Sequence, residues 1–109
     1  MNLAQDIETK REINTSHMQE NARATTLFLK SLAHEGRLTI LCRLAEGPAT
    51  VGELEQVLSV RQSSVSQQLA RLRNEGLVDC ERDGRAIRYF LSDERTRQVV
   101  GLLYNLFCD

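Results

Sequence analysis

With 109 residues, 41% of them hydrophobic and 27% charged, the chain has the composition of one soluble globular domain and not of a fibrous or disordered protein. Its formal net charge of −1 excludes the nucleic-acid binders that are recognised by overall basicity alone. Two Tyr, three Phe and no Trp leave little material for a deep small-molecule pocket.

Neither secretion nor membrane insertion is expected from the chain. Its first ten residues, "MNLAQDIETK", contain acids and no apolar segment, and the apolar run "LTILCRLA" is interrupted by Arg43. The chain has three cysteines, an odd number, and they lie far apart in the sequence, unlike the cysteines of a secreted disulfide framework. We therefore expect a cytoplasmic protein with no membrane partner, in which any cysteine chemistry is regulatory.

The first 46 residues are expected to contain an arm and two helices. Residues 1–16 are polar without a sustained period, which predicts a mobile arm ahead of one domain over residues 17–109. Helical spacing of apolar residues predicts a first helix over residues 17–32 and a second over residues 34–46, which Gly47 and Pro48 end. One stripe of the second helix is expected to face the core and comprises Leu38, Leu41, Cys42 and Ala45.

Two short helices separated by a tight turn are predicted next. Thr50 and Glu53 have capping-box spacing, which predicts a helix over residues 51–58. After the turn, another helix is expected to begin near residue 62 and to end at Gly76, a suitable C-terminal cap. Its buried side should carry Val65, Leu69 and Leu72. Such a pair is a helix-turn-helix.

The period then changes to two, over residues 77–91, as expected for a β-hairpin. The dipeptide Asp83-Gly84 supplies a two-residue turn signal, and three arginines should lie near the hairpin tip, namely Arg82, Arg85 and Arg88.

A last helix is predicted over residues 93–108, capped by Ser92 or Asp93. Its broad apolar surface comprises Val99, Val100, Leu103, Leu106 and Phe107 and needs a neighbour, such as a second subunit. The whole order, four helices, a hairpin and a helix, predicts a mainly α winged helix-turn-helix with a small β-hairpin, assembled as a homodimer.

The helix near residue 62 opens with six uncharged hydrogen-bonding residues, which are Gln62, Ser63, Ser64, Ser66, Gln67 and Gln68. A solvated face would more often carry Glu and Lys. A recognition helix presents such side chains to base edges at its N-terminal end, where the helix dipole also favours phosphate. The alternative is an ordinary polar surface, although six arginines against four acidic residues give residues 61–88 a local +2, which leaves −3 for the rest.

We therefore expect double-stranded operator DNA as the partner of this helix and of the hairpin, which would act as a wing. Phosphate contacts carry no sequence information, and arginines are suited to them. The candidates for this role are Arg71, Arg73, Arg82, Arg85 and Arg88.

The chain after residue 20 resembles the ArsR/SmtB family of winged-helix repressors, most specifically in "SVSQQLARLRNEGLV" followed by "RDGRAIRYFL". The resemblance implies a dimeric bacterial repressor that leaves operator DNA when an inducer binds. One departure is Glu35-Gly36, where many members carry a Pro after the His, and it bears on where the second helix starts.

Metal sensing is the first alternative to consider for the inducer. A soft-metal site before the recognition helix needs paired thiols, which "ELEQVL" does not contain, and the last helix has no His for an interface zinc site. His17 and His34 remain, and each is more typical of an exposed or locally bonded histidine. We predict no metal site and no cofactor.

Two cysteines instead match the family's BigR/SqrR-type subgroup, which responds to persulfides. Cys42 in "ILCRLAEG" and Cys108 in "YNLFCD" are similar to the subgroup's cysteine pair, which becomes bridged within one protomer. This resemblance implies a redox-sensing pair and a persulfide or polysulfide inducer. Cys80 matches no site of the subgroup and is expected to be a half-buried strand residue.

The distance between the two cysteines would determine whether a disulfide or a polysulfide bridge forms. A direct disulfide requires Cα atoms within about 4.4 to 6.8 Å, whereas each inserted sulfur adds roughly 2 Å, so a wider pair would favour polysulfide bridges. Cys108 lies beside a helix C-terminus and Asp109, which disfavour its thiolate, so Cys42 is the expected first nucleophile. Spacing alone also allows both cysteines to be small core residues.

Other functions remain open from the sequence. A repressor of this family could respond to a metal or to general oxidants. A thiol-redox enzyme would need a C-x-x-C motif or an activating base beside a cysteine, which neither "ILCRL" nor "LFCD" contains, so no enzyme is predicted. A protein-interaction module using only the last helix would show no salt-dependent binding to DNA.

Overall fold

A computed structural model of the chain describes residues 11–58 and 62–108, with residues 62 and 63 described by their backbone alone. The chain divides into two units, residues 1–30 and residues 31–109. Within the described residues, no helix combines the length and the apolar character that crossing a membrane would demand.

Most of the first unit that is described belongs to helix α2 (Thr15–Leu32). The helix begins two residues earlier than expected because the Asn14 side chain accepts a hydrogen bond from the His17 N–H at 3.1 Å and caps the first turn. Of the predicted arm, residues 11–14 have no regular secondary structure, Thr15 and Ser16 belong to α2, and residues 1–10 lie outside the described residues.

Helix α3 (Glu35–Glu46) begins after an unusual cap. The Nδ1 atom of His34 accepts hydrogen bonds from the backbone N–H groups of Gly36, at 3.1 Å, and Arg37, at 3.3 Å. This cap supplies the start at the position where the sequence departs from the family pattern. The helix ends at Gly47, as predicted, where the Gly47 N–H bonds to the Leu44 carbonyl.

The two helices of the helix-turn-helix begin and end close to the predicted bounds, whereas the turn predicted between them, at residues 59–61, lies outside the described residues. Helix α4 (Val51–Leu58) follows the short strand β1 (Ala49–Thr50), and helix α5 (Gln62–Asn74) follows α4. Val65, Leu69 and Leu72 are fully buried, as their spacing predicts. Gly76 has a φ of +81°, the left-handed conformation expected of a C-terminal cap.

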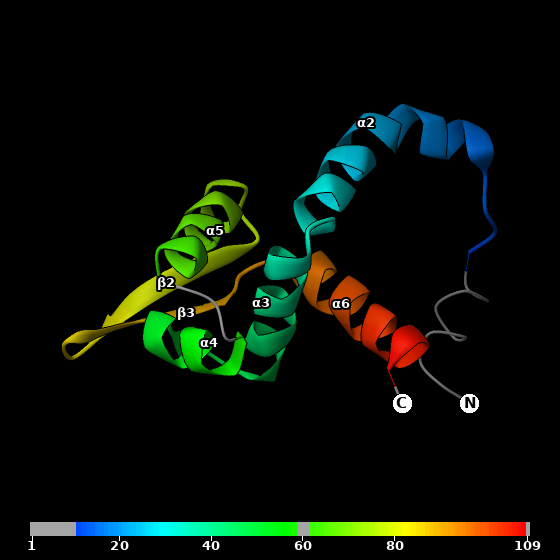
Figure 1. Cartoon of the computed structure of the whole chain (residues 1–109). Coiled ribbons are helices and arrows are strands. Elements are labelled where there is room, and N and C mark those ends of the chain that lie inside the picture. Colours follow the sequence, from blue (N-terminus) through cyan, green and yellow to red (C-terminus); the bar gives the residue numbers. More distant parts are fainter. Residues whose placement is uncertain (1–10, 59–61, 109) are drawn as a thin grey trace. The chain divides into compact units, whose positions relative to one another are not determined.

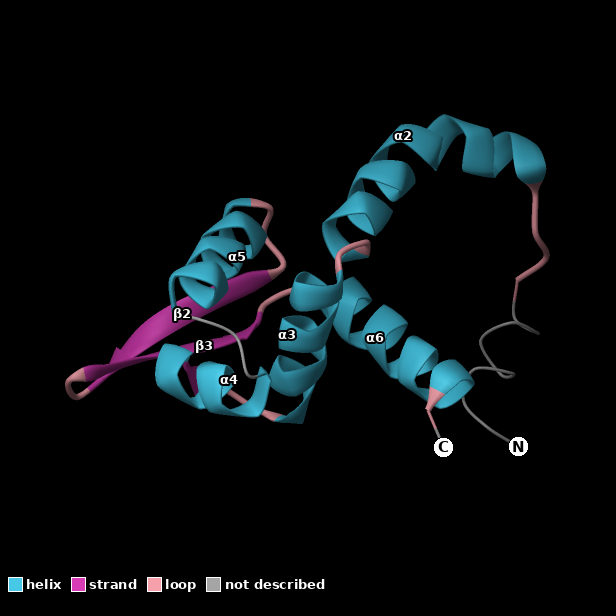
Figure 2. Ribbon diagram, viewed as in Figure 1, coloured by secondary structure: helices cyan, strands magenta, loops and turns pink. Residues whose placement is uncertain are grey.

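Strand β1 was not predicted, and it enlarges the hairpin of β2 (Val78–Asp83) and β3 (Ala86–Leu91) into an antiparallel sheet of order β1-β3-β2. Asp83 pairs with Ala86, so Gly84 and Arg85 form the loop, one residue later than the predicted Asp83-Gly84 turn. Gly84 provides the φ of +66° at this loop. Figure 2 shows the hairpin extending away from α3 with this turn at its far end.

Helix α3 occupies the centre of the second unit and contacts α4, α5, β3 and helix α6 (Glu94–Phe107) (Figure 1). Asp93 caps α6, because its carboxylate accepts hydrogen bonds from the Thr96 N–H at 3.1 Å and the Thr96 hydroxyl at 2.7 Å. The core is built from aliphatic side chains that include Ile40, Leu41, Leu44, Leu54, Val78, Leu91 and Val100.

The predicted core stripe of α3 was partly wrong. Ile40, Leu41 and Leu44 are buried, whereas Leu38 is 37% exposed and Cys42 is half-buried. The buried face differs from the predicted one because α3 packs against α4, α5 and β3 as well as α6, and Leu38 and Cys42 line a cavity beside α6.

Candidate functional site

The polar residues at the start of α5 lie on its outer side. The buried residues Val65, Leu69 and Leu72 fix the rotation of the helix, and Ser64, Ser66 and Gln67 are consequently exposed. Gln62 and Ser63 belong to the first turn of α5, but their side chains lie outside the described residues. The exposed members are short hydrogen-bonding groups, as contact with base edges requires.

Gln68 differs from its neighbours, because its side chain is half-buried and faces α3. Its Oε1 atom accepts a hydrogen bond from the Arg37 guanidinium at 3.3 Å. Arg37 is only 6% exposed, and its Nε donates to the Ser31 carbonyl at 2.8 Å. Gln68 is therefore held from inside the protein, by a residue that the sequence did not single out.

Two candidate phosphate-binding arginines of α5 are exposed but take part in ion pairs. Arg71 pairs with Glu75 at 3.4 Å and Arg73 pairs with Asp79 at 3.0 Å, with more than half of each arginine side chain exposed. Exposed pairs of this kind contribute little to stability, so the arginines can exchange a carboxylate for a phosphate at small cost.

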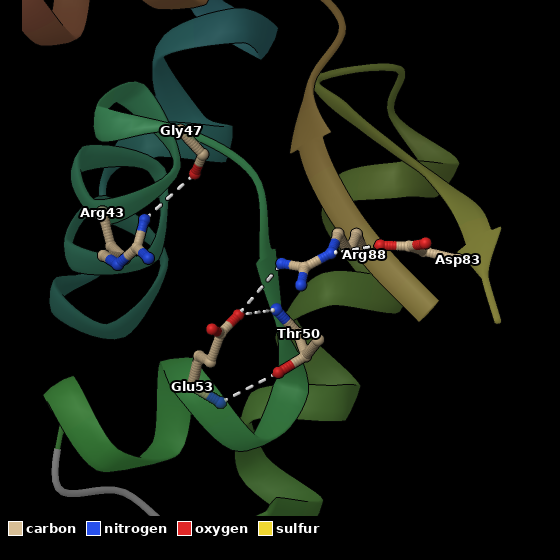
Figure 3. Close-up of polar contacts among 6 residues, drawn as sticks. All are labelled: Arg43, Gly47, Thr50, Glu53, Asp83 and Arg88. Carbon is tan, nitrogen blue, oxygen red and sulfur yellow. Dashed lines mark hydrogen bonds and ion pairs between the residues drawn. The ribbon is translucent and has the colours of Figure 1, made fainter. Parts of the chain in front are cut away.

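The three arginines of the hairpin have different surroundings. Arg82 and Arg85 are exposed near the turn, and the structure of residues 11–58 and 62–108 gives neither of them an ion pair. Arg88 instead bonds to Asp83 at 2.9 Å and to Glu53 at 3.5 Å (Figure 3). Arg88 thus attaches the hairpin to the start of α4, while Arg82 and Arg85 keep their donors available.

The start of α4 forms the predicted capping box. Glu53 accepts a hydrogen bond from the Thr50 N–H at 2.9 Å, and the Thr50 hydroxyl accepts one from the Glu53 N–H at 3.1 Å (Figure 3). The bond from the Thr50 N–H, followed by the charge of Arg88, outweighs desolvation and holds the pKa of Glu53 below its ordinary value. This junction joins the helix-turn-helix to the hairpin.

Cys42 and Cys108 line one cavity of about 350 Å³ between α3 and α6. The remaining lining residues are Leu38, Val100, Leu103, Tyr104 and Phe107. Cys42 is half-buried within this cavity and Cys108 is exposed. The structure therefore brings together two cysteines that lie 66 positions apart in the sequence.

The electrostatics of the pair act on Cys42. Burial, followed by the negative charge that Cys108 carries as a thiolate and then by Glu46, raises the pKa of the Cys42 thiol. This disfavours Cys42 as the first nucleophile, contrary to the sequence-based expectation, which rested on the surroundings of Cys108 alone. Cys80 is a half-buried residue of β2, as expected, opposite Tyr89 of β3.

The walls of the cavity were not predicted, although part of the signal is visible in the sequence. Leu38 precedes Cys42 by four residues and Tyr104 precedes Cys108 by four, which is the spacing of neighbours on one helix face. That α3 and α6 face each other depends on tertiary packing. Within residues 11–58 and 62–108, no three His, Cys, Asp or Glu side chains are grouped as a metal ion would require.

The chain matches a known protein family. The family described as "Bacterial regulatory protein, arsR family" matches residues 34–79, which run from the cap of α3 into β2. The matched segment therefore contains the whole helix-turn-helix.

Two curated proteins are similar over most of the chain. A biofilm growth-associated repressor of Agrobacterium fabrum is 41% identical over 97 residues, which cover 89% of this chain and 83% of that protein. The transcriptional activator HlyU of Vibrio cholerae is 38% identical over 96 residues, which cover 88% of this chain and 89% of that protein.

Solved structures agree with the arrangement of the elements. The transcriptional repressor BigR from Xylella fastidiosa superposes with a TM-score of 0.84 at 38% identity, over 89% of this chain and 99% of that chain. Reduced HlyU from Vibrio cholerae superposes with a TM-score of 0.80 at 38% identity, over 85% of this chain and 98% of that chain.

Proposed function

Since the chain belongs to the arsR family of bacterial regulatory proteins, which are DNA-binding transcriptional regulators and not enzymes, we propose that it is a dithiol-based transcriptional repressor. It binds palindromic operator DNA as a homodimer when Cys42 and Cys108 are reduced. Persulfides bridge the two thiols through a disulfide or polysulfide and release the DNA. The protein acts in the cytoplasm, where the reduced state is maintained.

The surface of α5 and the hairpin supports the DNA-binding part of the proposal. Ser64, Ser66 and Gln67 are exposed on the outer side of α5 and are suited to base edges. Four exposed positive charges are suited to phosphates, namely Arg71 and Arg73 of α5 and Arg82 and Arg85 of the hairpin. Gln62 and Ser63, in the first turn of α5, are assigned to the same surface by their place in the sequence.

One observation carries the sensing part: two thiols from distant segments share one cavity, near enough for the charge of Cys108 to act on Cys42. Such an arrangement allows an intramolecular bridge. Two relatives, in Agrobacterium fabrum and Xylella fastidiosa, are named as repressors, and one solved structure of a relative is described as the reduced form.

The effect of the bridge on DNA binding would be transmitted through α3. This helix carries Cys42 and contacts both α6 and α5, so tying α3 to α6 changes the packing against which α5 is held. In a dimer, two recognition helices must meet major-groove faces about 34 Å apart, and a change in their separation or orientation weakens binding.

Mass spectrometry and operator binding on the same sample test the proposal. In a Cys80→Ser background, persulfide treatment should add sulfur across Cys42 and Cys108, with loss of two hydrogens, and weaken operator binding by about 5- to 150-fold, the usual range of an allosteric coupling. Cys42→Ser and Cys108→Ser should each bind operator and keep that affinity after treatment.

Two outcomes would contradict the proposal. If the bridged protein held operator as tightly as the reduced protein, sensing would not control DNA binding. If hydrogen peroxide produced a simple disulfide with equal release of DNA and persulfide added no sulfur, the protein would be a general oxidant sensor. Equal release on adding a divalent metal, with both cysteines free, would favour the metal-responsive alternative.

A further inference from the structure

The cavity that holds the two thiols is chemically uniform. Apart from the cysteines, it is lined by four hydrocarbon side chains, Leu38, Val100, Leu103 and Phe107, and by Tyr104. Its volume of about 350 Å³ lies at the lower end of the range typical of small-molecule sites. The lining therefore offers apolar contact to a small ligand.

No Lys, Arg or His is among the described residues that line this cavity. The charges that act on Cys42 are both negative, those of the Cys108 thiolate and of Glu46 on the last turn of α3. The cavity is only partly enclosed, since Phe107 is 81% and Tyr104 52% exposed. An anionic sulfur donor lying against its hydrocarbon walls would still lose part of its hydration, would find no lining cation in compensation and would be repelled by these negative charges. An uncharged donor avoids both penalties.

We propose that the inducer enters this cavity as an uncharged polysulfide with small apolar ends, and that polysulfides with charged ends react slowly. This inference rests on the proposed dithiol function and specifies its substrate class. The hydrocarbon walls bind the apolar ends, and the sulfur chain lies between the two cysteines.

The chemistry balances for a dialkyl trisulfide, R–S–S–S–R. The thiolate of the exposed Cys108 attacks the central sulfur, so a new S–S bond forms, one of the original S–S bonds breaks, and RS⁻ leaves with the electron pair. The Cys42 thiolate then attacks the transferred sulfur and expels the second RS⁻. The product is a Cys42–S–S–S–Cys108 bridge, in which the two outer sulfurs are those of the cysteines and the middle one comes from the reagent. The two cysteine thiols together lose two electrons, and the trisulfide gains them and leaves as two thiolates. The two cysteine protons end on those thiolates or in solvent.

Two trisulfides that differ only in their ends give the sharpest test. Dipropyl trisulfide has apolar ends and bis-glutathionyl trisulfide has anionic ends, while both transfer the same sulfur. The full-length Cys80→Ser protein is treated with each, quenched with acid, and the bridged fraction is followed by intact mass. Each rate is divided by that of the same protein unfolded in urea, which removes the intrinsic reactivity of the reagent.

The corrected rate should be at least about tenfold higher for dipropyl trisulfide, since a local field of one sign changes association rates by 10- to 1,000-fold. Leu38→Lys places a cation on the cavity wall at a position that is 37% exposed, so the preference should fall or reverse. Val57→Lys adds the same charge on α4, away from the cavity, and should leave the preference unchanged. Glu46→Gln, which needs no repacking because Glu46 is exposed, should raise the rate more for the anionic reagent than for dipropyl trisulfide.

The outcomes separate this inference from the function on which it rests. Equal corrected rates, or a faster reaction with bis-glutathionyl trisulfide, would overturn the inference while leaving the dithiol switch intact. A preference unaffected by both Leu38→Lys and Glu46→Gln would also overturn it, because the cavity would not be its source. If neither reagent bridged Cys42 and Cys108, the inference would fail, and if persulfide did not bridge them either, the proposed function would fail as well.

Discussion

At the scale of single residues, the two thiols of the cavity are unequal. Cys42 is half-buried and has a raised pKa, so little of it is thiolate near neutral pH. Cys108 is exposed, after the last turn of α6. We therefore expect an external electrophile to react with Cys108 first and Cys42 to complete the proposed bridge from inside the cavity.

We expect iodoacetamide at pH 8 to label Cys108 before Cys42 in the Cys80→Ser protein. Because Cys108 and Glu46 both raise the pKa of Cys42, Cys108→Ser and Glu46→Gln should each lower it and speed the labelling of Cys42. The gain should stay below about tenfold, since charges near an accessible surface interact by about 1 kcal/mol or less.

The measurement is peptide mass spectrometry over time. Glu46→Gln acts as the control for access, because it leaves the Cys108 side chain in place. Faster labelling of Cys42 than of Cys108 in the parent protein would contradict the assigned order of attack.

At the scale of elements, α3 and α5 are joined by a buried polar contact as well as by hydrocarbon packing. Arg37 of α3 donates to Gln68 of α5 and to the Ser31 carbonyl, and the Ser31 hydroxyl donates to Glu75 after the end of α5. The Arg37–Gln68 bond attaches the recognition helix directly to the helix that carries Cys42, and the Ser31–Glu75 bond attaches it to the end of α2, to which Arg37 also bonds. They provide a route by which a change at α3 reaches α5.

Gln68→Ala should consequently behave as a positioning change and not as the loss of a base contact. It removes the acceptor of a bond to a buried charged group, so the free energy of unfolding should fall by about 1.5 kcal/mol, measured by urea denaturation. Operator affinity should fall by a similar factor for every single-base variant of the site. The ratio of the operator affinity of the reduced protein to that of the bridged protein should become smaller.

Gln67→Ala is the matched control. Gln67 is exposed, so its loss should leave the free energy of unfolding within about 0.5 kcal/mol and alter the preference at one base position. A Gln68→Ala protein that lost preference at one base position, with unchanged stability, would show that Gln68 reads DNA directly.

The junction of α4 with the hairpin has a pH dependence that follows from Glu53. The folded-state pKa of Glu53 is lowered, so its stabilising contribution is fully present above the unfolded-state pKa and is lost as the pH falls through the folded-state value. Glu53→Gln should lower the thermal midpoint at pH 7 by a few degrees at most, because the group is exposed. The parent and variant midpoints, measured by circular dichroism between pH 7 and pH 2, should converge at acid pH, and a constant difference would contradict this account.

Elements defined by local signals could be predicted from the sequence, whereas those defined by tertiary contacts could not. The capping box of Thr50 and Glu53 and the spacing of Val65, Leu69 and Leu72 are local, and α4 and α5 were predicted correctly. Strand β1 has only two residues, which is too short to show a period, and it exists because β3 pairs with it. A charged residue is expected to be exposed, so neither the burial of Arg37 nor its hold on Gln68 could be predicted.

At the scale of the whole molecule, α6 carries a second apolar surface besides the cavity wall. The dimer strip comprises Val99, Leu102 and Leu106, at helical spacing. Leu102 is 43% and Leu106 67% exposed, and neither lines the cavity. We expect a second copy of the chain to cover this strip, because a family regulator that reads two half-sites needs a twofold assembly.

Leu106→Glu should therefore convert a dimer to a monomer, because burying an unpaired carboxylate in the subunit interface is strongly unfavourable. Sedimentation velocity at micromolar concentration measures the change. Val57→Glu, which places the same charge at an exposed position of α4, should remain dimeric.

Affinity for a two-half-site duplex should fall at least about 100-fold in Leu106→Glu, since linked binding gains a factor of roughly 10² to 10⁴ over a single site. The proposed bridge joins Cys42 to Cys108 of one protomer, so its rate of formation with dipropyl trisulfide should persist in the monomer. A Leu106→Glu protein that remained dimeric would move the interface away from α6, and loss of bridging in the monomer would mean that the partner subunit completes the cavity.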